Sequence, residues 1–471
     1  MPPARILRRL TTLSLFALLS ASAFARSPNL ILILSDDQGF DLACFGKKEF
    51  FTPHLDRMAA EGVRATQFYN TASVCTPSRS GLITGRYPQR NGTYEMIRND
   101  MVNYGHRYTP TEYATSPEMT LGLDVREKTF GDILRGAGYR TAVFGKWDMG
   151  STRRFLPLQR GFDAFYGHGN NGIDYYTHER YGAPSMYKGN SLTTAEKGTY
   201  ATEIFRREAV AFIRENRARP FFLYLPFNAP HSASNLDKDS NQVPASYLKK
   251  YYPDRDPKDS RTKYAGMVSA MDEAIGEVFS TLRELQLDRD TLVLFLADNG
   301  RNGGQVDGVA LRGGKSSGFE GGLRTPFIAW WPGVLPAGRT TTEFLSSLEV
   351  LPTLAAAGGA SLPTGLKLDG FNMLPVLQGK AKSARTEMFW DWPSVYEVAR
   401  VGQHKWVSYV PRGRRGEVPA KEELFDLSAD PSEKNNLAAA QPELLAQVKA
   451  RYAKWQAEMA AAEPRGPFRD Y

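Results

Sequence analysis

Four apolar stretches, each followed at once by polar residues, limit what this chain can fold into. They span residues 29–35, 141–144, 221–227 and 291–297, with helical patterns between them. Continuous apolar runs of this kind are typical of strands buried on both faces of a parallel sheet. The side chains that follow the runs include Asp36, Asp37, Lys146, Asp148, His231, Asp298 and Asn299. Because ligands bind outside the carboxyl ends of such strands, we predict that these groups meet in one cleft.

The remaining patterns complete the predicted architecture. Apolar residues recur with three-and-four spacing from Tyr264 to Leu282, which indicates a long helix, and a shorter helix is expected at 129–138. After about residue 380 the pattern changes to short strand-like runs followed by a final helix. We therefore predict an α/β fold with two parts. A mostly parallel sheet between helices occupies residues 26–380, and a smaller C-terminal α+β domain occupies 381–471.

The N-terminal residues predict export. Arginines at positions 5, 8 and 9, an apolar run over 10–24 and a small-x-small pattern ending at Ala25 are typical of a signal peptide cleaved near that residue. No later stretch approaches about 18 uninterrupted apolar residues, so no membrane span is expected. The net charge of +8 is modest for 471 residues, and no nucleic-acid-binding module is visible. We expect a periplasmic or secreted protein without a nucleic-acid partner.

Two polar pairs at strand ends suggest a metal site. Asp36 with Asp37, and Asp298 with Asn299, offer the oxygen ligands that suit Ca²⁺ or Mg²⁺ and do not suit zinc. One such pair alone is more often a turn or a helix cap. Two pairs at equivalent strand ends favour the metal.

The most specific motif surrounds Cys75, in residues 73–87. A cysteine at the start of a helix has amide N–H groups pointing toward it, and Arg79 one turn later adds a positive charge. This arrangement suits a tetrahedral oxyanion. The alternative is an ordinary buried cysteine, with Arg79 in a surface ion pair. Cys44 lacks this context and is expected to be an ordinary small buried residue.

The segment closely resembles the Cys-x-Pro-Ser-Arg signature of the type I sulfatases. The resemblance continues through all four strand ends and through residues 312–326 and 423–437, so it covers nearly the whole mature chain. It implies an alkaline-phosphatase-like fold and hydrolysis of sulfate esters. It also implies that a separate maturation enzyme oxidises Cys75 to formylglycine, whose hydrate is the nucleophile. Residues 174–179 and 264–273 are most similar to the N-acetylgalactosamine 4-sulfatase (arylsulfatase B) branch.

The resemblance implies a role for each matched residue. Ca²⁺, or Mg²⁺ in its place, would be held by Asp36, Asp37, Asp298, Asn299 and the modified Cys75. The basic groups that would share the sulfate oxygens are Arg79, Lys146, His231 and Lys315, and His231 would also protonate the leaving alcohol.

One residue departs from the family pattern. The usual Gly-Lys-x-His is Gly-Lys-Trp-Asp here, so Asp148 stands where a histidine is expected. A carboxylate can act as a base or as an orienting hydrogen-bond acceptor, but it brings no positive charge to the sulfate. We therefore expect an altered pH dependence or a substrate-specific rearrangement, with activity retained.

Three functions remain open on the sequence. The favoured one is an exported sulfatase acting on a sulfated carbohydrate, with Tyr175, Tyr176 and Trp330 as candidates for packing against sugar rings. The second is a phosphodiester or phosphonate monoester hydrolase with the same nucleophile, because sulfate and phosphate are both tetrahedral. The third is a non-catalytic binder of sulfated glycans, suggested by Asp148 and by the dependence on maturation.

Overall fold

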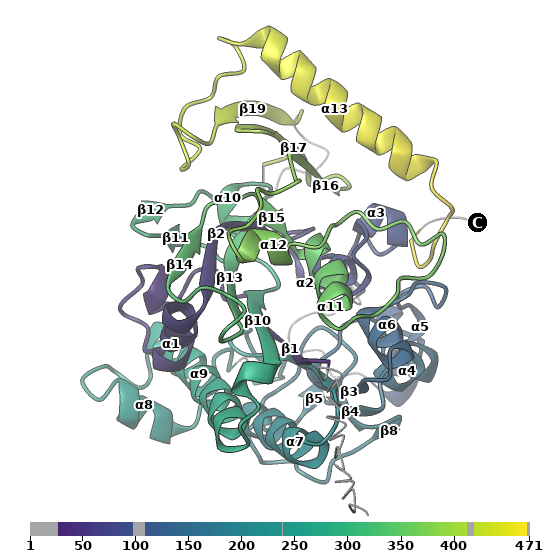
Figure 1. Ribbon diagram of the computed structural model, residues 1–471, viewed down its shortest axis with the longest axis vertical. Helices are drawn as coiled ribbons and strands as arrows, with labels where there is room; N and C mark the ends of the chain where they lie inside the picture. Colours follow the sequence, from purple (N-terminus) through teal and green to yellow (C-terminus); the bar gives the residue numbers. More distant parts are fainter. Residues whose placement is uncertain (1–26, 98–108, 238, 412–418, 469–471) are drawn as a thin grey trace, which may run out of the picture.

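The computed structural model describes residues 27–97, 109–237, 239–411 and 419–468, so the predicted signal peptide lies outside it (Figure 1). Its largest element is an eleven-stranded sheet with the order β14-β2-β13-β10-β1-β9-β3-β4-β7-β8, in which β15 also pairs with β2. The central strands are parallel. They are β10 (Thr291–Ala297), β1 (Asn29–Ser35), β9 (Phe221–Pro226), β3 (Arg140–Lys146) and β4 (Ala164–His168). The four predicted strands are therefore neighbours, and the mostly parallel sheet is confirmed.

The margins of the sheet are mixed. The strands β13, β2, β7 and β8 introduce antiparallel pairings, whereas β14 and β15 run parallel to β2. Their bounds are β2 (Val63–Tyr69), β7 (Met186–Lys188), β8 (Ser191–Leu192), β13 (Arg324–Trp330), β14 (Arg339–Thr341) and β15 (Leu345–Ser346). Smaller ribbons are formed by β5 (Glu179–Arg180) with β6 (Ala183–Pro184), and by β11 (Gln305–Val306) with β12 (Val309–Ala310).

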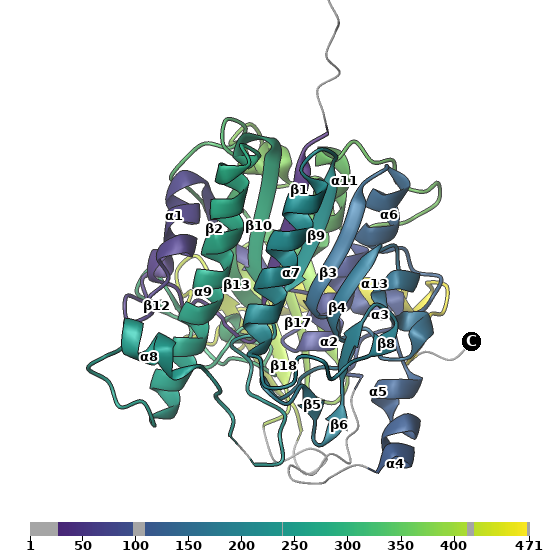
Figure 2. The same ribbon diagram turned by 90° about the horizontal axis from the view of Figure 1, so that it is seen from below.

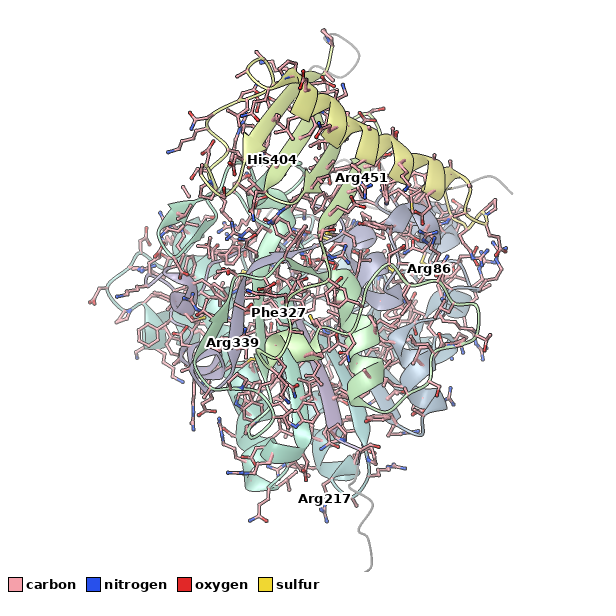
Figure 3. The ribbon with its side chains drawn as sticks, turned by 45° about the horizontal axis from the view of Figure 1, so that its top comes forward. Arg86, Arg217, Phe327, Arg339, His404 and Arg451 are labelled. Carbon is pink, nitrogen blue, oxygen red and sulfur yellow. The ribbon has the colours of Figure 1, made fainter. Side chains whose placement is uncertain are left out.

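Helices cover both faces of the sheet, because the central strands are apolar on both sides. Ile31 and Ile33 of β1 belong to one core cluster and Leu32 to the other. The first face is covered by α1 (Pro53–Glu61), α7 (Ala201–Asn216) and the predicted long helix α9 (Ser260–Glu284), and α7 and α9 lie in front of the strands in Figure 2. The second is covered by α2 (Cys75–Thr84), α6 (Phe130–Gly136) and α11 (Val350–Ala357). Phe327, labelled in the interior in Figure 3, stacks on Phe68 at 4.4 Å between ring centroids.

The C-terminal part is an antiparallel sheet covered by one helix, as predicted. Its strands are β16 (Glu387–Trp392), β17 (Tyr396–Val401), β18 (His404–Tyr409) and β19 (Lys421–Asp426). The helix α13 (Pro442–Ala460) buries Val448, Tyr452, Trp455 and Met459 against this sheet, at the top of Figure 1. The boundary near residue 380 stays a prediction.

Short helices fill the connections. They are α3 (Pro88–Asn91), α4 (Pro110–Thr115), α5 (Pro117–Thr120), α8 (Ala245–Tyr251), α10 (Glu320–Leu323) and α12 (Leu374–Leu377). Single turns of 3₁₀ helix lie at Ala43–Phe45, Arg153–Phe155, Pro157–Gln159, Asp288–Asp290 and Ser347–Glu349. Among the helices in the described ranges, none combines the length and the apolar character needed to cross a bilayer.

Candidate active site

The carboxyl ends of β1, β10, β9 and β3 bring the predicted residues together. Ser35 and Ala297 are register partners, so the residues that follow them, Asp36 and Asp298, emerge side by side. Backbone hydrogen bonds continue past the strands: Asp298 N donates to Ser35 O at 3.0 Å, and Asp36 N donates to Ala229 O at 3.1 Å. The second bond ties the loop that carries His231 to the first acidic pair.

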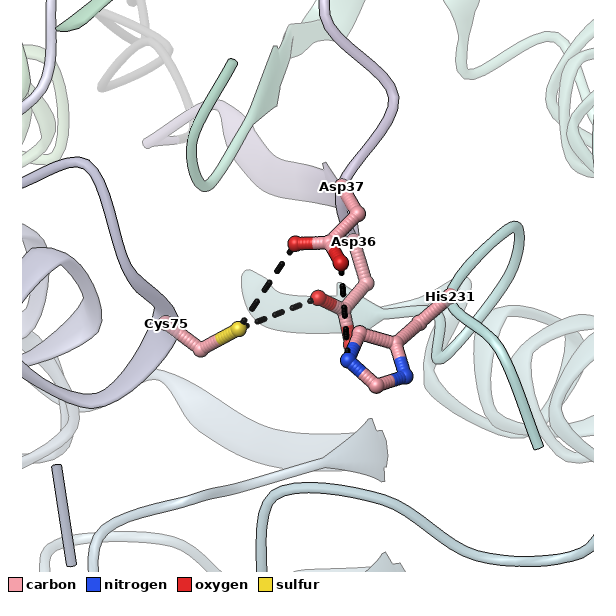
Figure 4. A group of neighbouring side chains, drawn as sticks. All are labelled: Asp36, Asp37, Cys75 and His231. Atoms are coloured by element: carbon pink, nitrogen blue, oxygen red, sulfur yellow. Dashed lines mark hydrogen bonds and ion pairs between the residues drawn. The ribbon is translucent and has the colours of Figure 1, made fainter. Parts of the chain in front are cut away.

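Cys75 points into this group of oxygen atoms. It is the first residue of α2 and has no solvent exposure. Its Sγ lies 3.4 Å from Asp36 Oδ1, 3.8 Å from Asp37 Oδ1 and 3.6 Å from Asn299 Oδ1, and Figure 4 shows the first two contacts. Burial, and next the carboxylates of Asp298 and Asp36, raise the pKa of the thiol well above its ordinary value. The unmodified sulfur is therefore a neutral thiol near pH 7 and a poor nucleophile.

Each of the three carboxylates in this group forms an ion pair with a cation. Arg79 Nη2 lies 2.9 Å from Asp298 Oδ2, Lys146 Nζ lies 2.6 Å from Asp36 Oδ2, and Lys315 Nζ lies 2.6 Å from Asp37 Oδ2. Burial would lower the pKa of both lysines, but the Asp36 and Asp37 carboxylates outweigh it and hold both values above normal. All three cations are thus charged. Arg79 and Lys146 are completely buried, which contradicts the alternative of a surface ion pair for Arg79.

His231 lies on the more exposed side of the group. Its Nε2 is 3.4 Å from Asp37 Oδ2 and 3.3 Å from Lys315 Nζ, while Nδ1 lies 2.7 Å from the Ser232 carbonyl oxygen. Since Nδ1 donates to that carbonyl, Nε2 is the atom left to face a bound substrate. Burial, and next the charge of Lys315, lower the pKa of the imidazole to about 3.

The Tyr175 side chain fixes the loop that carries His231. Its hydroxyl donates to the carbonyl oxygens of Asn228 and His231, at 2.8 and 2.9 Å. Tyr175 and Trp330 are completely or almost completely buried in the core, and Tyr176 is partly buried against it. The expectation that Tyr175 and Trp330 pack against sugar rings is therefore wrong, because their rings fill the space between the sheet and its helices.

Asp148 occupies a strained and enclosed position. Its φ of +57° lies in the left-handed region that side chains rarely adopt. Oδ1 accepts a hydrogen bond from Thr76 Oγ1 at 3.1 Å, whereas Oδ2 has no hydrogen-bond partner among the described residues and lies 3.7 Å from Lys146 Nζ. Burial raises the pKa of the carboxyl to about 6, although Lys146 acts in the opposite direction. Thr76 follows Cys75 directly, so Asp148 is linked to the start of α2.

The donor set fits a divalent cation. Asp36, Asp37, Cys75 and His231 each offer a ligand atom, and these atoms lie within 4.8 Å of one another. Asn299 Nδ2 donates a hydrogen bond to Asp37 Oδ1 at 2.8 Å. The Asp298 carboxylate accepts hydrogen bonds from Asp37 N and from Arg79 Nε. The three carboxylates of these ion pairs balance the three cations, and Asp148 beside Lys146 adds a negative charge when it is ionised. A divalent ion would therefore make the site positive, as binding of a sulfate ester requires.

Sequence reasoning missed some contributors to this site. Ser73 and Tyr396 are an example, because they are 323 positions apart and share no local pattern. His231 was expected in the same cleft but not among the candidate metal ligands, where the structure places its ring. Cys44 is partly buried, and its backbone N–H donates to Asp56 Oδ1 at 2.7 Å, outside the group around Cys75.

Comparison with known proteins identifies the family. The model of the family described as "Sulfatase" matches residues 28–360, and that described as "N-sulphoglucosamine sulphohydrolase, C-terminal" matches residues 315–458. The chain belongs to the sulfatase family.

Its relatives among sulfatases are similar over most of their length. The N-acetylgalactosamine-6-sulfatase of Canis lupus familiaris is 32% identical, over 91% of this chain and 85% of its own. Human arylsulfatase A is also 32% identical, over 96% and 92% of the two chains. The crystal structure of Ps i-CgsB superposes with a TM-score of 0.77 and 28% identity, covering 91% of this chain and 93% of that chain.

Several predictions are thereby confirmed for this sulfatase. It has the alkaline-phosphatase-like fold, and it is a sulfuric ester hydrolase. The N-acetylgalactosamine 4-sulfatase branch stays a prediction, since the relatives named above are a 6-sulfatase and an arylsulfatase A.

Proposed function

We propose that this sulfatase is exported and removes sulfate from a sulfated carbohydrate, using formylglycine formed from Cys75 and a bound Ca²⁺ ion. The observation that carries the proposal is the position of Cys75. Its Sγ lies 3.4 to 3.8 Å from oxygen atoms of three residues that follow two different strands. A buried neutral thiol has no evident use there, whereas an oxidised side chain with hydroxyl groups would face both the metal ligands and the cations.

The names of the relatives support the substrate class. One curated relative is an N-acetylgalactosamine-6-sulfatase, and Ps i-CgsB has been crystallised in complex with a neocarrahexaose. N-acetylgalactosamine is a sugar, and a neocarrahexaose is a chain of sugars. Export rests on the N-terminal residues, and it would allow the protein to meet sulfated polysaccharides outside the cytoplasm.

Each residue has a role that follows from its position. Asp36, Asp37, Asp298 and Asn299 would hold the ion, which supplies positive charge opposite the sulfate oxygens when it is bound. Arg79 and Lys146 are fixed by their carboxylate partners at 2.9 and 2.6 Å, so they orient the buried side of the sulfate without rearrangement.

The exposed side of the site would meet the leaving alcohol. The charged Lys315 Nζ can donate a proton to the departing oxygen there, and it donates a hydrogen bond to His231 Nε2 at 3.3 Å, which places the imidazole beside that oxygen. Asp148 contacts Thr76 and Lys146 and is not part of the group of candidate metal ligands. Its hydrogen bond to Thr76 makes it an orienting residue for the start of α2.

The experiment combines mass spectrometry of the peptide that contains Cys75 with measurement of sulfate release. The panel contains an aryl sulfate, sulfated mono- and oligosaccharides, a phosphate diester and a phosphonate monoester. We expect an aldehyde at position 75, and sulfate release that Cys75→Ala abolishes and the matched control Cys44→Ala retains. An unmodified thiol in active protein would contradict the proposed nucleophile. Faster turnover of the phosphonate or the diester would favour the second function considered above.

A further inference from the structure

A hollow next to Lys315 takes no part in the chemistry described so far. Its volume is about 330 Å³, and it lies between residues 312–319 of the sulfatase domain and the hairpin formed by β17 and β18. Lys315 lines this hollow and also reaches Asp37 with its ammonium group. The hollow therefore adjoins the exposed side of the site, where the alcohol leaves.

One wall of the hollow is aromatic and held in place by several contacts. The ring of Tyr409 meets the ring of Phe319 edge to face, with centroids 5.1 Å apart. The Arg312 guanidinium lies 3.9 Å from the centre of Phe319 and forms an ion pair with Glu423. The Tyr409 hydroxyl also lies 3.3 Å from Glu423 Oε1. Tyr409 is only partly buried, so part of its surface can contact a ligand.

The two domains shape the hollow together. A Cβ atom at Gly318 would lie 2.6 Å from Val398 Cγ2, so only glycine lets this loop approach β17 so closely. On the hairpin side, Val410 N donates to Val395 O at 3.0 Å, which sets the positions of both valines. The hollow is thus a fixed feature of the domain interface.

Its lining suits a sugar ring that carries negative charge. The described lining residues include two cations, Arg312 and Lys315, and no aspartate or glutamate. The carboxylates that pair with these cations, Glu423 and Asp37, are not among them. Tyr409, Val395 and Val410 add apolar surface. Aromatic and aliphatic walls with a few polar groups are typical of sites that hold a ring and fix its orientation.

We propose that this hollow binds the sugar residue next to the one that carries the scissile sulfate, and that the natural substrate is therefore a sulfated oligosaccharide or polysaccharide. The inference rests on the proposed sulfatase function and specifies its substrate. Tyr409 acts in it as a specificity residue, because the contacts of its side chain are with Phe319, Glu423 and Arg312, which are not metal ligands or sulfate-binding cations.

The test compares a small substrate with longer ones. Matured wild type, Tyr409→Ala and Val410→Trp are assayed with 4-nitrophenyl sulfate, and with N-acetylgalactosamine 6-sulfate alone and as the end residue of a disaccharide and a tetrasaccharide. Sulfated carrageenan oligosaccharides form a second series. Tyr247→Ala is the matched control, because Tyr247 is a partly buried tyrosine on α8 that does not line the hollow.

For the wild type we expect kcat/KM to rise from the monosaccharide to the disaccharide in at least one series. Both hollow variants should lose about 10-fold in kcat/KM on the oligosaccharides, mainly through KM, and stay within about twofold of wild type on 4-nitrophenyl sulfate. Tyr247→Ala should match the wild type on every substrate. Equal losses on small and long substrates, or no loss on the oligosaccharides, would overturn this inference alone. If matured wild type releases sulfate from none of these substrates, the proposed function is overturned as well.

Discussion

The hydroxyl oxygen of Tyr396, on β17 of the C-terminal sheet, lies 2.9 Å from Ser73 Oγ. The backbone N–H of Ser73 donates to the same hydroxyl at 3.3 Å. Close by, Trp390 Nε1 on β16 donates to the Asn70 carbonyl oxygen at 2.6 Å. The C-terminal sheet therefore holds the segment that leads into α2, and the position of Cys75 depends on both domains.

Replacing Tyr396 with phenylalanine should slow turnover while leaving substrate affinity nearly unchanged. The ring stays in place, but the start of α2 loses two hydrogen bonds, so we expect kcat on an aryl sulfate to fall about 10-fold with little change in KM. The free energy of unfolding should fall by about 1–3 kcal/mol. Tyr139→Phe is the control, because this buried hydroxyl donates to the Pro28 carbonyl oxygen at 2.8 Å, away from the site. If Tyr396→Phe keeps the wild-type kcat, the contact has no positioning role.

Asp148 should make activity decline as the pH rises. Its pKa is raised to about 6, so the carboxyl is neutral below that pH and negative above it, where it repels sulfate. The charged groups around it are Lys146 on β3, Arg79 on α2 and Asp36 after β1. Asp148→Asn is neutral at every pH, so we expect its kcat/KM at pH 8 to exceed that of wild type by about 10-fold or more. The measurement is kcat/KM from pH 5 to 9.

A second substitution at this position provides a cross-check. Asp148→His restores the residue of the usual family pattern and should change the pH profile as well as the rate. Rates and profiles equal to wild type for both variants would show that Asp148 has no such role.

Divalent ions should stabilise the folded protein. A ligand that binds only the native state at 100 times its Kd adds about 2.7 kcal/mol to the free energy of unfolding. We expect a chelator to lower Tm and to stop sulfate release, and Ca²⁺ to restore both, with Mg²⁺ compared in parallel. Asp37→Asn should weaken the response, and Asp239→Asn, in an exposed pair with Lys263, should not. A chelated protein with unchanged Tm and activity would refute the metal site.

The buried lysine between the domains should be important for stability. Lys405 Nζ lies 2.9 Å from Glu320 and 2.8 Å from Glu433, and all three side chains are completely buried. Lys405→Met removes the cation that the two buried carboxylates share and leaves Glu320 with Arg324 at 3.5 Å, which should cost about 3–5 kcal/mol of unfolding free energy.

The stability of Lys405→Met should increase as the pH falls. Without Lys405, burial favours the protonated forms of Glu320 and Glu433, so their pKa values rise and part of the lost stability should return as the pH falls. Lys449→Met breaks an exposed pair with Glu422 and should cost about 1 kcal/mol or less. Chemical denaturation at pH 5, 7 and 8 measures both variants. Equal stability losses in the two would contradict the argument.

Local patterns predicted the secondary structure around the site well. The predicted strand 291–297 coincides with β10, because a continuous apolar run buried on both faces is visible without knowledge of its neighbours. The predicted helix at 129–138 is α6, and Thr129 caps it by accepting a hydrogen bond from Asp132 N. The aromatic residues were less informative, since Tyr175 proved to be part of the core and a support of the His231 loop.

The sequence alone determined the four strand ends with acidic and basic side chains, the Cys75 segment at a helix start, and the C-terminal sheet, because each is recorded in a short run of neighbouring residues. Tertiary structure alone decided that Lys315 pairs with Asp37, that Tyr396 supports Ser73, and that a hollow lies between the two domains. Contacts of this kind depend on how distant segments pack, and packing leaves no periodic trace in the order of the residues.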